Sequence, residues 1–136
     1  MMIEHTIQIR PRYGETDQMG IVYYGRYAEY FEVARTEWLR SLGMSYAWME
    51  QTLNILLPVR HLSIHYKAPA YYDQPLSVIT VVKEKPVRLI SFHHTVLNED
   101  KRILATGQVE LVFVDKHTWK PVKAPSAFLQ LIEENW

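Results

Sequence analysis

One long helical pattern, followed by a run of strand patterns, most constrains what this chain can fold into. Between residues 23 and 42, apolar and aromatic residues recur at helical spacing, and charged residues of alternating sign fill the wetter side. The apolar stripe consists of Tyr27, Tyr30, Phe31, Ala34 and Trp38. We expect a helix this aromatic to be wrapped by other structure rather than laid on a surface. Gly43 is expected to end it.

After residue 53 the pattern changes from helical to alternating. Strands are predicted over residues 5–10 before the helix and over residues 76–83, 88–98 and 103–115 after it. Another strand is predicted over residues 61–67, with a start that could lie as early as residue 56. A short helix is predicted over 46–51, capped by Ser45, and residues 126–134 are expected to form a short helix or a partly ordered tail. Because short turns join consecutive strands, the strands should pair antiparallel. The expected fold class is α+β, a curved antiparallel sheet of about five strands wrapped around the long central helix.

Composition excludes several classes of function. The 136 residues are expected to form a single domain, residues 1–136, with a substantial core. The 15 basic and 15 acidic residues balance, which argues against a nucleic-acid partner or attraction to an anionic membrane. The chain has no cysteine, so thiol nucleophiles and disulfides are excluded. Neither a signal peptide nor a membrane-spanning apolar run is recognisable, so the expected location is the cytoplasm.

The familiar motifs of metal, nucleotide and serine chemistry are missing. His61 and His65 would share a strand face about 13 Å apart, which is too far for two ligands of one ion. No G-x-S-x-G elbow, P-loop or G-x-G-x-x-G occurs. What remains is carboxylate chemistry at Glu15 or Asp17.

These two acids lie in a short polar loop, residues 13–24, that runs directly into the long helix. A helix N-terminus exposes unpaired backbone N–H groups and carries partial positive charge. Negative charge developing there during a reaction would be stabilised. The alternative interpretation is that Glu15 and Asp17 are ordinary loop acids near a helix start.

At this loop the sequence resembles a known family. The segment YGETDQMGIVYYGRY at residues 13–27, followed by FEVAR at 31–35, resembles the signature of the 4-hydroxybenzoyl-CoA thioesterase family, which includes the Tol-Pal-linked acyl-CoA thioesterase. IHYKAPAYYD at residues 64–73 resembles a second, looser family block. The resemblance runs from about residue 7 to 121. It implies a hotdog fold, a dimer with a continuous sheet that often pairs into a tetramer, active sites at the subunit interface, and no metal or redox cofactor.

The resemblance also implies roles for individual residues. Asp17 matches the catalytic aspartate, acting as nucleophile on the thioester carbonyl or as general base for a water. Tyr24 falls where the backbone N–H of the helix start polarises the thioester oxygen. Many Tol-Pal-linked relatives have a histidine at this position with an assigned catalytic role, and Tyr24 removes that role here. Arg26 is expected to contact a carboxylate such as Glu15, since a cation near a helix start is otherwise unfavourable.

The substrate implied by the resemblance is an acyl-CoA. Lys67, Lys83, Lys85 and Arg88 are candidates for contacts to the CoA phosphates, although each could equally be a solvated charge at a strand end. The acyl pocket is expected to be apolar and lined by helix aromatics with Leu57 and Val59. Tyr27, Phe31 and Trp38 are expected to be core residues.

The leading hypothesis is therefore an acyl-CoA thioesterase that works as a homo-oligomer, a dimer or tetramer. A second hypothesis moves the thioester to acyl carrier protein. A third is a non-catalytic acyl-CoA-binding protein of the same fold. A hotdog dehydratase is disfavoured, because no histidine occurs between His5 and His61.

Overall fold

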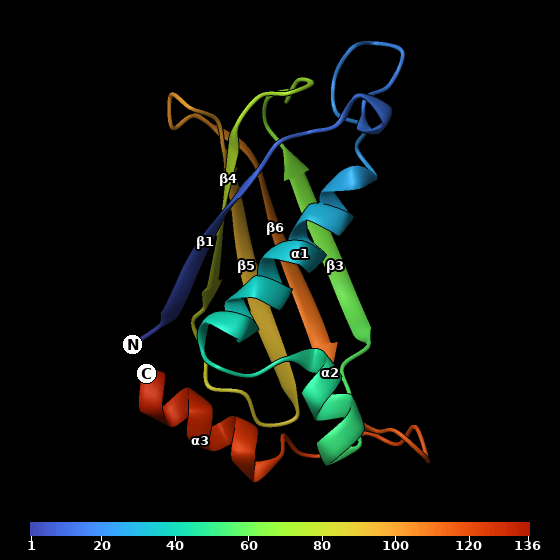
Figure 1. The fold of residues 1–136 in the computed structure, drawn as a ribbon, viewed down its shortest axis with the longest axis vertical. Helices are drawn as coiled ribbons and strands as arrows, with labels where there is room; N and C mark the ends of the chain where they lie inside the picture. The colour runs from blue at the N-terminus through green and yellow to red at the C-terminus, as the bar shows by residue number, and fades with distance from the viewer.

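A five-stranded antiparallel sheet wraps one long helix in the computed structural model, which describes residues 1–136 (Figure 1). The helix is α1 (Arg26–Ser41). The strands lie in the spatial order β1-β4-β5-β6-β3. Their bounds are β1 (Ile3–Ile9), β3 (Val59–Tyr66), β4 (Leu76–Val82), β5 (Leu89–Leu97) and β6 (Ile103–Val112). Every neighbouring pair is antiparallel, so the predicted α+β architecture is confirmed.

Helix α1 presents its aromatic stripe to the concave side of the sheet. Phe31 and Trp38 are fully buried, and the Trp38 ring packs edge-on against Phe92 of β5 with ring centroids 5.1 Å apart. The helix begins three residues later than the pattern predicted, because residues 23–25 form a turn in front of it. It ends as predicted at Gly43, whose φ of +96° favours glycine.

The remaining elements close one end of the molecule. Ser45 caps α2 (Tyr46–Trp48) by accepting a hydrogen bond from the Trp48 amide, and a π-helical turn, η2 (Met49–Leu53), continues it. The strand predicted over 103–115 is divided at Phe113, although the Phe113 amide keeps the β5–β6 register by bonding the Arg88 carbonyl. The chain beyond it forms β7 (Val114–Asp115), which pairs with β2 (Ile55–Leu56). Helix α3 (Ser126–Asn135) packs Phe128 against Phe113.

Strand β3 is one free edge of the sheet. Seven of its eight residues are exposed, whereas the side chains of β4 and β5 alternate between buried and half-buried. One helix enclosed by a curved antiparallel sheet is the hotdog architecture that the resemblance implies. No helix in the structure has the length and apolar character needed to cross a bilayer.

Candidate active site

The loop between β1 and α1 is closed at its neck by backbone hydrogen bonds. The Tyr23 amide donates to the Glu15 carbonyl over 2.9 Å, and the Asp17 amide donates to the Ile21 carbonyl over 2.8 Å. Gly20, with a φ of +83°, makes the tight reversal at the tip. The loop is therefore a small hairpin that holds Asp17 in a fixed position in front of α1.

Asp17 has one committed and one free carboxylate oxygen. Its Oδ1 accepts a hydrogen bond of 2.9 Å from the Met19 amide, an Asx-type turn within the loop. The other oxygen has no hydrogen-bond partner in the chain, and the side chain is half-buried. This oxygen is available to a substrate.

The start of α1 supplies an unpaired donor. The Arg26 amide bonds back to the Tyr23 carbonyl, but the Tyr24 amide donates to no group of the chain. Gly25 precedes the first helical residue and provides no side-chain cap. The Tyr24 N–H, one residue before the N-cap Gly25, is thus an unpaired donor beside the positive end of the helix dipole.

Asp17 and Tyr24 line the same pocket, which has a volume of about 530 Å³. The other lining residues come from the loop, α1 and the segment that leaves β3: Met19, Ile21, Val22, Tyr27, Tyr66, Lys67, Ala68 and Pro69. Most of these are apolar, so an apolar group can be buried beside the carboxylate. Burial raises the pKa of the Tyr27 hydroxyl to about 12, and Tyr66 adds to the effect.

Tyr66 joins β3 to the helix start. Its hydroxyl donates a hydrogen bond of 2.8 Å to the Tyr24 carbonyl, and its ring lies edge-on to Tyr27 with centroids 5.3 Å apart. Sequence reasoning did not single out Tyr66. The available signal was a tyrosine at the end of the strand face that carries Leu62 and Ile64, within the second block of the resemblance.

Glu15 is a structural acid. Its carboxylate, almost fully buried, accepts hydrogen bonds from the Arg12 amide at 2.9 Å, the Arg12 Nε at 3.1 Å and the Tyr30 hydroxyl at 2.8 Å. Burial alone would raise the pKa of Glu15, but these hydrogen bonds outweigh it and the pKa lies below its ordinary value. Arg26 contacts a carboxylate as expected, but not that of Glu15. Arg26 pairs with Glu29 of its own helix at 2.9 Å, because Arg12 already occupies Glu15.

The basic residues proposed for CoA phosphates do not gather in one protomer. Lys67 lines the Asp17 pocket. Lys85 and Arg88 lie in the turn between β4 and β5, at the opposite end of the sheet from the Asp17 loop (Figure 1). There the Lys85 Nζ forms an ion pair with the Glu133 Oε1 of α3 over 2.7 Å and lies over the Trp136 ring.

The expected wall of the acyl pocket also needs correction. Leu57 and Val59 do not line the Asp17 pocket; each lines one of two small pockets beside Arg35 of α1. The direction of β3 explains this difference, because the strand begins at Val59 and reaches the Asp17 loop only at its other end, Tyr66. Tyr27 is buried as expected, but it also forms part of the pocket wall.

The histidines take no part in this pocket, and no three His, Asp or Glu side chains converge as metal ligands would. His94 is a core residue, stacked on Phe31 with ring centroids 4.5 Å apart and hydrogen-bonded through Nδ1 to Thr80. The chemically equipped part of this site is therefore a carboxylate and a backbone amide.

The chain is similar in sequence to several known proteins. The family described as the Thioesterase-like superfamily matches residues 11–132. Acyl-CoA thioesterase YbgC of Haemophilus influenzae is 33% identical over 117 residues, which cover 86% of this chain and 85% of that protein. Acyl-CoA thioester hydrolase YbgC of Shigella flexneri is 30% identical over 124 residues, which cover 89% of this chain and 90% of that protein.

Solved structures are similar over nearly the whole chain. DHNA-CoA thioesterase from Staphylococcus aureus superposes with a TM-score of 0.91 at 32% identity, covering 96% of this chain and 89% of that one. At 20% identity, 4-hydroxybenzoyl-CoA thioesterase from Pseudomonas superposes with a TM-score of 0.85, which is a likeness of fold.

Proposed function

The chain belongs to the thioesterase-like superfamily, and we propose that it hydrolyses acyl-CoA thioesters to a free carboxylic acid and CoA. One observation carries the proposal: a carboxylate with a free oxygen and an unpaired backbone N–H at a helix start line one apolar pocket. The names of the two YbgC relatives agree with it. In this proposal residues 1–136 act as a single domain.

The proposed role of the Tyr24 amide is to hold the thioester carbonyl oxygen. That oxygen gains negative charge as the carbonyl carbon becomes tetrahedral. A fixed N–H at the positive end of α1 stabilises this charge more than it stabilises the neutral thioester, which lowers the barrier. The Tyr66 hydroxyl, bound to the Tyr24 carbonyl, keeps the helix start in place during the reaction.

The proposed role of Asp17 has two forms with the same products. As nucleophile, a carboxylate oxygen adds to the carbonyl carbon, the C–S bond breaks to release the CoA thiolate, and water hydrolyses the resulting anhydride. As general base, the carboxylate takes a proton from a water that adds to the same carbon; the tetrahedral intermediate then collapses, the C–S bond breaks, and the released CoA thiolate takes up the proton. Both routes pass through a tetrahedral oxyanion and need Asp17 beside the Tyr24 amide.

The proposed position of CoA depends on a second copy of the chain. Strand β3 is an exposed edge, and antiparallel pairing of two β3 strands would form one continuous sheet. Such pairing brings the Lys67 end of one copy near the β4–β5 turn of the other. Lys67 and the other copy's Arg88 and Lys85 could then meet the phosphates of one CoA, although they lie at opposite ends of one protomer.

Thiol release from a panel of acyl-CoAs by the wild type and by Asp17→Asn tests the proposed function. Turnover by the wild type with loss in a folded Asp17→Asn variant supports it. Acyl-CoA that binds both proteins equally and is hydrolysed by neither would overturn it in favour of a non-catalytic binder. Thioesters on acyl carrier protein, assayed in parallel, determine which carrier is preferred.

A further inference from the structure

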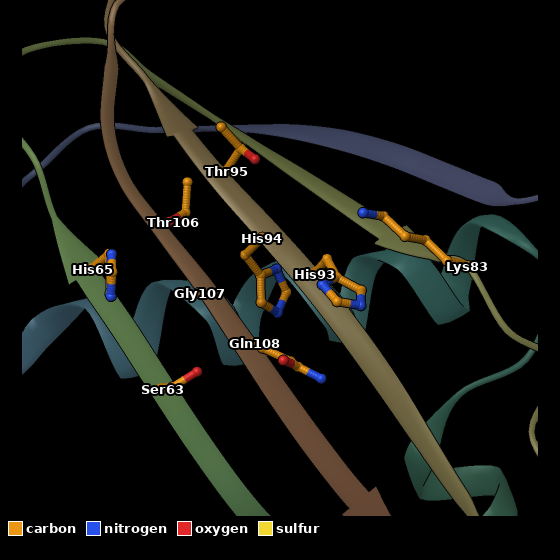
Figure 2. Close-up of a pocket in the computed structure, with 9 residues that line it drawn as sticks. All are labelled: Ser63, His65, Lys83, His93, His94, Thr95, Thr106, Gly107 and Gln108. Atoms are coloured by element: carbon orange, nitrogen blue, oxygen red, sulfur yellow. The ribbon is translucent and has the colours of Figure 1, made fainter.

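The outer face of the sheet, on the side away from α1, carries a polar pocket with a volume of about 390 Å³ (Figure 2). None of its lining residues is hydrophobic and none is acidic. Three strands and Lys83, which directly follows β4, contribute side chains to it. The sheet itself separates this pocket from Asp17, so the proposed thioester chemistry does not use it.

Strand register brings the polar side chains together in two neighbouring rows. Residues paired across β3, β6 and β5 point to the same face, and successive rows on one face lie about 7 Å apart. One row is Ser63, Gln108 and His93, and the next is His65, Thr106 and Thr95. The hydroxyl, imidazole and amide groups of the pocket therefore lie next to one another on one face of the sheet.

Most of these groups have no partner within the chain. Gln108 donates to Ser91 over 3.0 Å, but the side chains of His65, His93 and Lys83 make no hydrogen bond or ion pair. Figure 2 shows the Lys83 side chain extending back over the sheet toward His93. His93 is half-buried, whereas His65 and Lys83 are exposed, so these unpaired donors converge where an external acceptor can reach them.

The charges around the pocket favour an anion. Lys83 lies close enough to His93 to join burial in lowering the pKa of that imidazole, with Glu84 acting in the opposite direction. Glu84, Glu110 and Glu4, which strand register places in the row of His93, are the nearby acids, and none of them lines the pocket. Glu110, in the next row, faces Arg60 at 3.8 Å. An anion inside therefore meets the positive charge of the exposed Lys83 side chain and no lining carboxylate.

We propose that this outer-face pocket binds a phosphate-type oxyanion, supplied by a free phosphorylated small molecule or by CoA. Lys83 provides the charge, and His93 and His65 provide N–H donors on either side. The hydroxyls of Ser63, Thr95 and Thr106 complete the set of donors to its oxygens. The site is distinct from the proposed thioesterase site and stands whether or not the protein turns over thioesters.

Titration with inorganic phosphate, followed by NMR of the histidine ring signals, tests the proposal. Sodium chloride at matched ionic strength is the reference. Phosphate should shift the His65 and His93 signals in a saturable way and leave His117, which lies in an exposed turn, unmoved. Lys83→Gln should weaken phosphate binding about five-fold or more. The control Lys120→Gln, at an exposed site away from the pocket, should leave it unchanged.

A parallel titration with CoA identifies the source of the anion. Shifts of the same two histidines by CoA, with the same dependence on Lys83, would assign the site to a phosphate of CoA; a response to phosphate alone would assign it to a free metabolite. Shifts that chloride reproduces, or that Lys83→Gln leaves unchanged, would overturn the proposal. The proposal would also be overturned if another copy of the chain covered this face. In that case light scattering would show an oligomer that Lys83→Gln dissociates.

Discussion

The hydroxyl of Tyr66 donates a 2.8 Å hydrogen bond to the carbonyl of Tyr24, and so joins the end of β3 to the residue whose amide is unpaired at the start of α1. The two rings also meet edge-on, with centroids 6.4 Å apart. A single side chain from the second sequence block thereby fixes the backbone presented by the first. In the proposed reaction Tyr66 is a positioning residue, since it acts through Tyr24.

Tyr66→Phe tests this role because it keeps the ring and removes only the hydroxyl. We expect kcat to fall roughly ten-fold with little change in KM, less than the hundred-fold or more lost when an oxyanion donor itself is removed. Steady-state thiol release measures both constants. The control is Tyr72→Phe, whose exposed hydroxyl makes no hydrogen bond. A Tyr66→Phe enzyme with unchanged kcat would show that the hydroxyl does not position the helix start.

Tyr30→Phe tests the attachment of the Asp17 loop to α1 through Glu15. The variant removes the 2.8 Å bond to the Glu15 carboxylate and leaves the two bonds from Arg12 in place. We expect a loss of about 1–3 kcal/mol in the free energy of unfolding, the range for a hydrogen bond to a charged group. Urea unfolding measures it, with Tyr71→Phe as the exposed control. Equal stability of the two variants would contradict the role of this bond.

Gly107→Ala tests the close approach of α1 to the middle of β6. A Cβ at Gly107 would lie 2.3 Å from Phe31 Cε2 and 3.1 Å from the Ser63 carbonyl. Because Phe31 is fully buried and has no room to move, we expect a loss of about 1–3 kcal/mol in stability. Gly14→Ala, where nothing lies within 4 Å of the new atom, is the matched control and should be nearly neutral. Thermal unfolding measures the stability of both variants, and equal stability would contradict the close approach of Phe31 to Gly107.

Because His94 is buried, we expect the folded protein to lose stability in acid. Burial lowers its pKa from 6.5 to about 3, with Arg35 and His93 adding to the effect. Because the unfolded state binds the proton more tightly, the neutral ring favours the folded state fully above pH 6.5. This contribution is lost as pH falls from 6.5 toward 3, on the order of 4 kcal/mol.

The double variant His94→Phe, Thr80→Val removes both members of the buried hydrogen bond and should flatten this acid limb. Glu15 is unchanged in the variant. Its lowered pKa contributes stability that is lost only as pH falls below its ordinary value of 4.5, and this loss is the same in both proteins. Urea unfolding from pH 7 to pH 3.5 measures both proteins. Parallel stability curves over that range would contradict the assignment to His94.

Much of the fold could be predicted from the spacing of apolar residues, because core burial is the main cause of that spacing. The buried stripe of α1 and the alternation of β4 and β5 both reflect which side chains face the core, and the structure confirms both. The pattern carried no signal for the division of the predicted strand 103–115 into β6 and β7. Residue 113 continues the period-two pattern of β6, and its amide still bonds the Arg88 carbonyl in the β5–β6 register, but Val114 and Asp115 beyond it pair with β2.

At the site, sequence reasoning brought Asp17 and Tyr24 together but missed the residues that hold them. Their partners come from remote positions: Tyr66 is 42 residues from Tyr24 along the chain, and Tyr30 is 15 from Glu15. A tyrosine on a buried helix face needs a partner for its hydroxyl, which was the signal for Tyr30. No local rule identifies which acid it binds, and the same limit led to the wrong partner for Arg26.

The most direct test of the central claim is a paired assay of thiol release from acyl-CoAs by the wild type and by Asp17→Asn, with folding checked by circular dichroism. The amide of asparagine preserves the size of the side chain and removes its nucleophilic and basic oxygen. We predict that the wild type releases CoA and that Asp17→Asn loses roughly a thousand-fold or more in kcat while still binding acyl-CoA. Full activity in a folded Asp17→Asn protein would contradict the account.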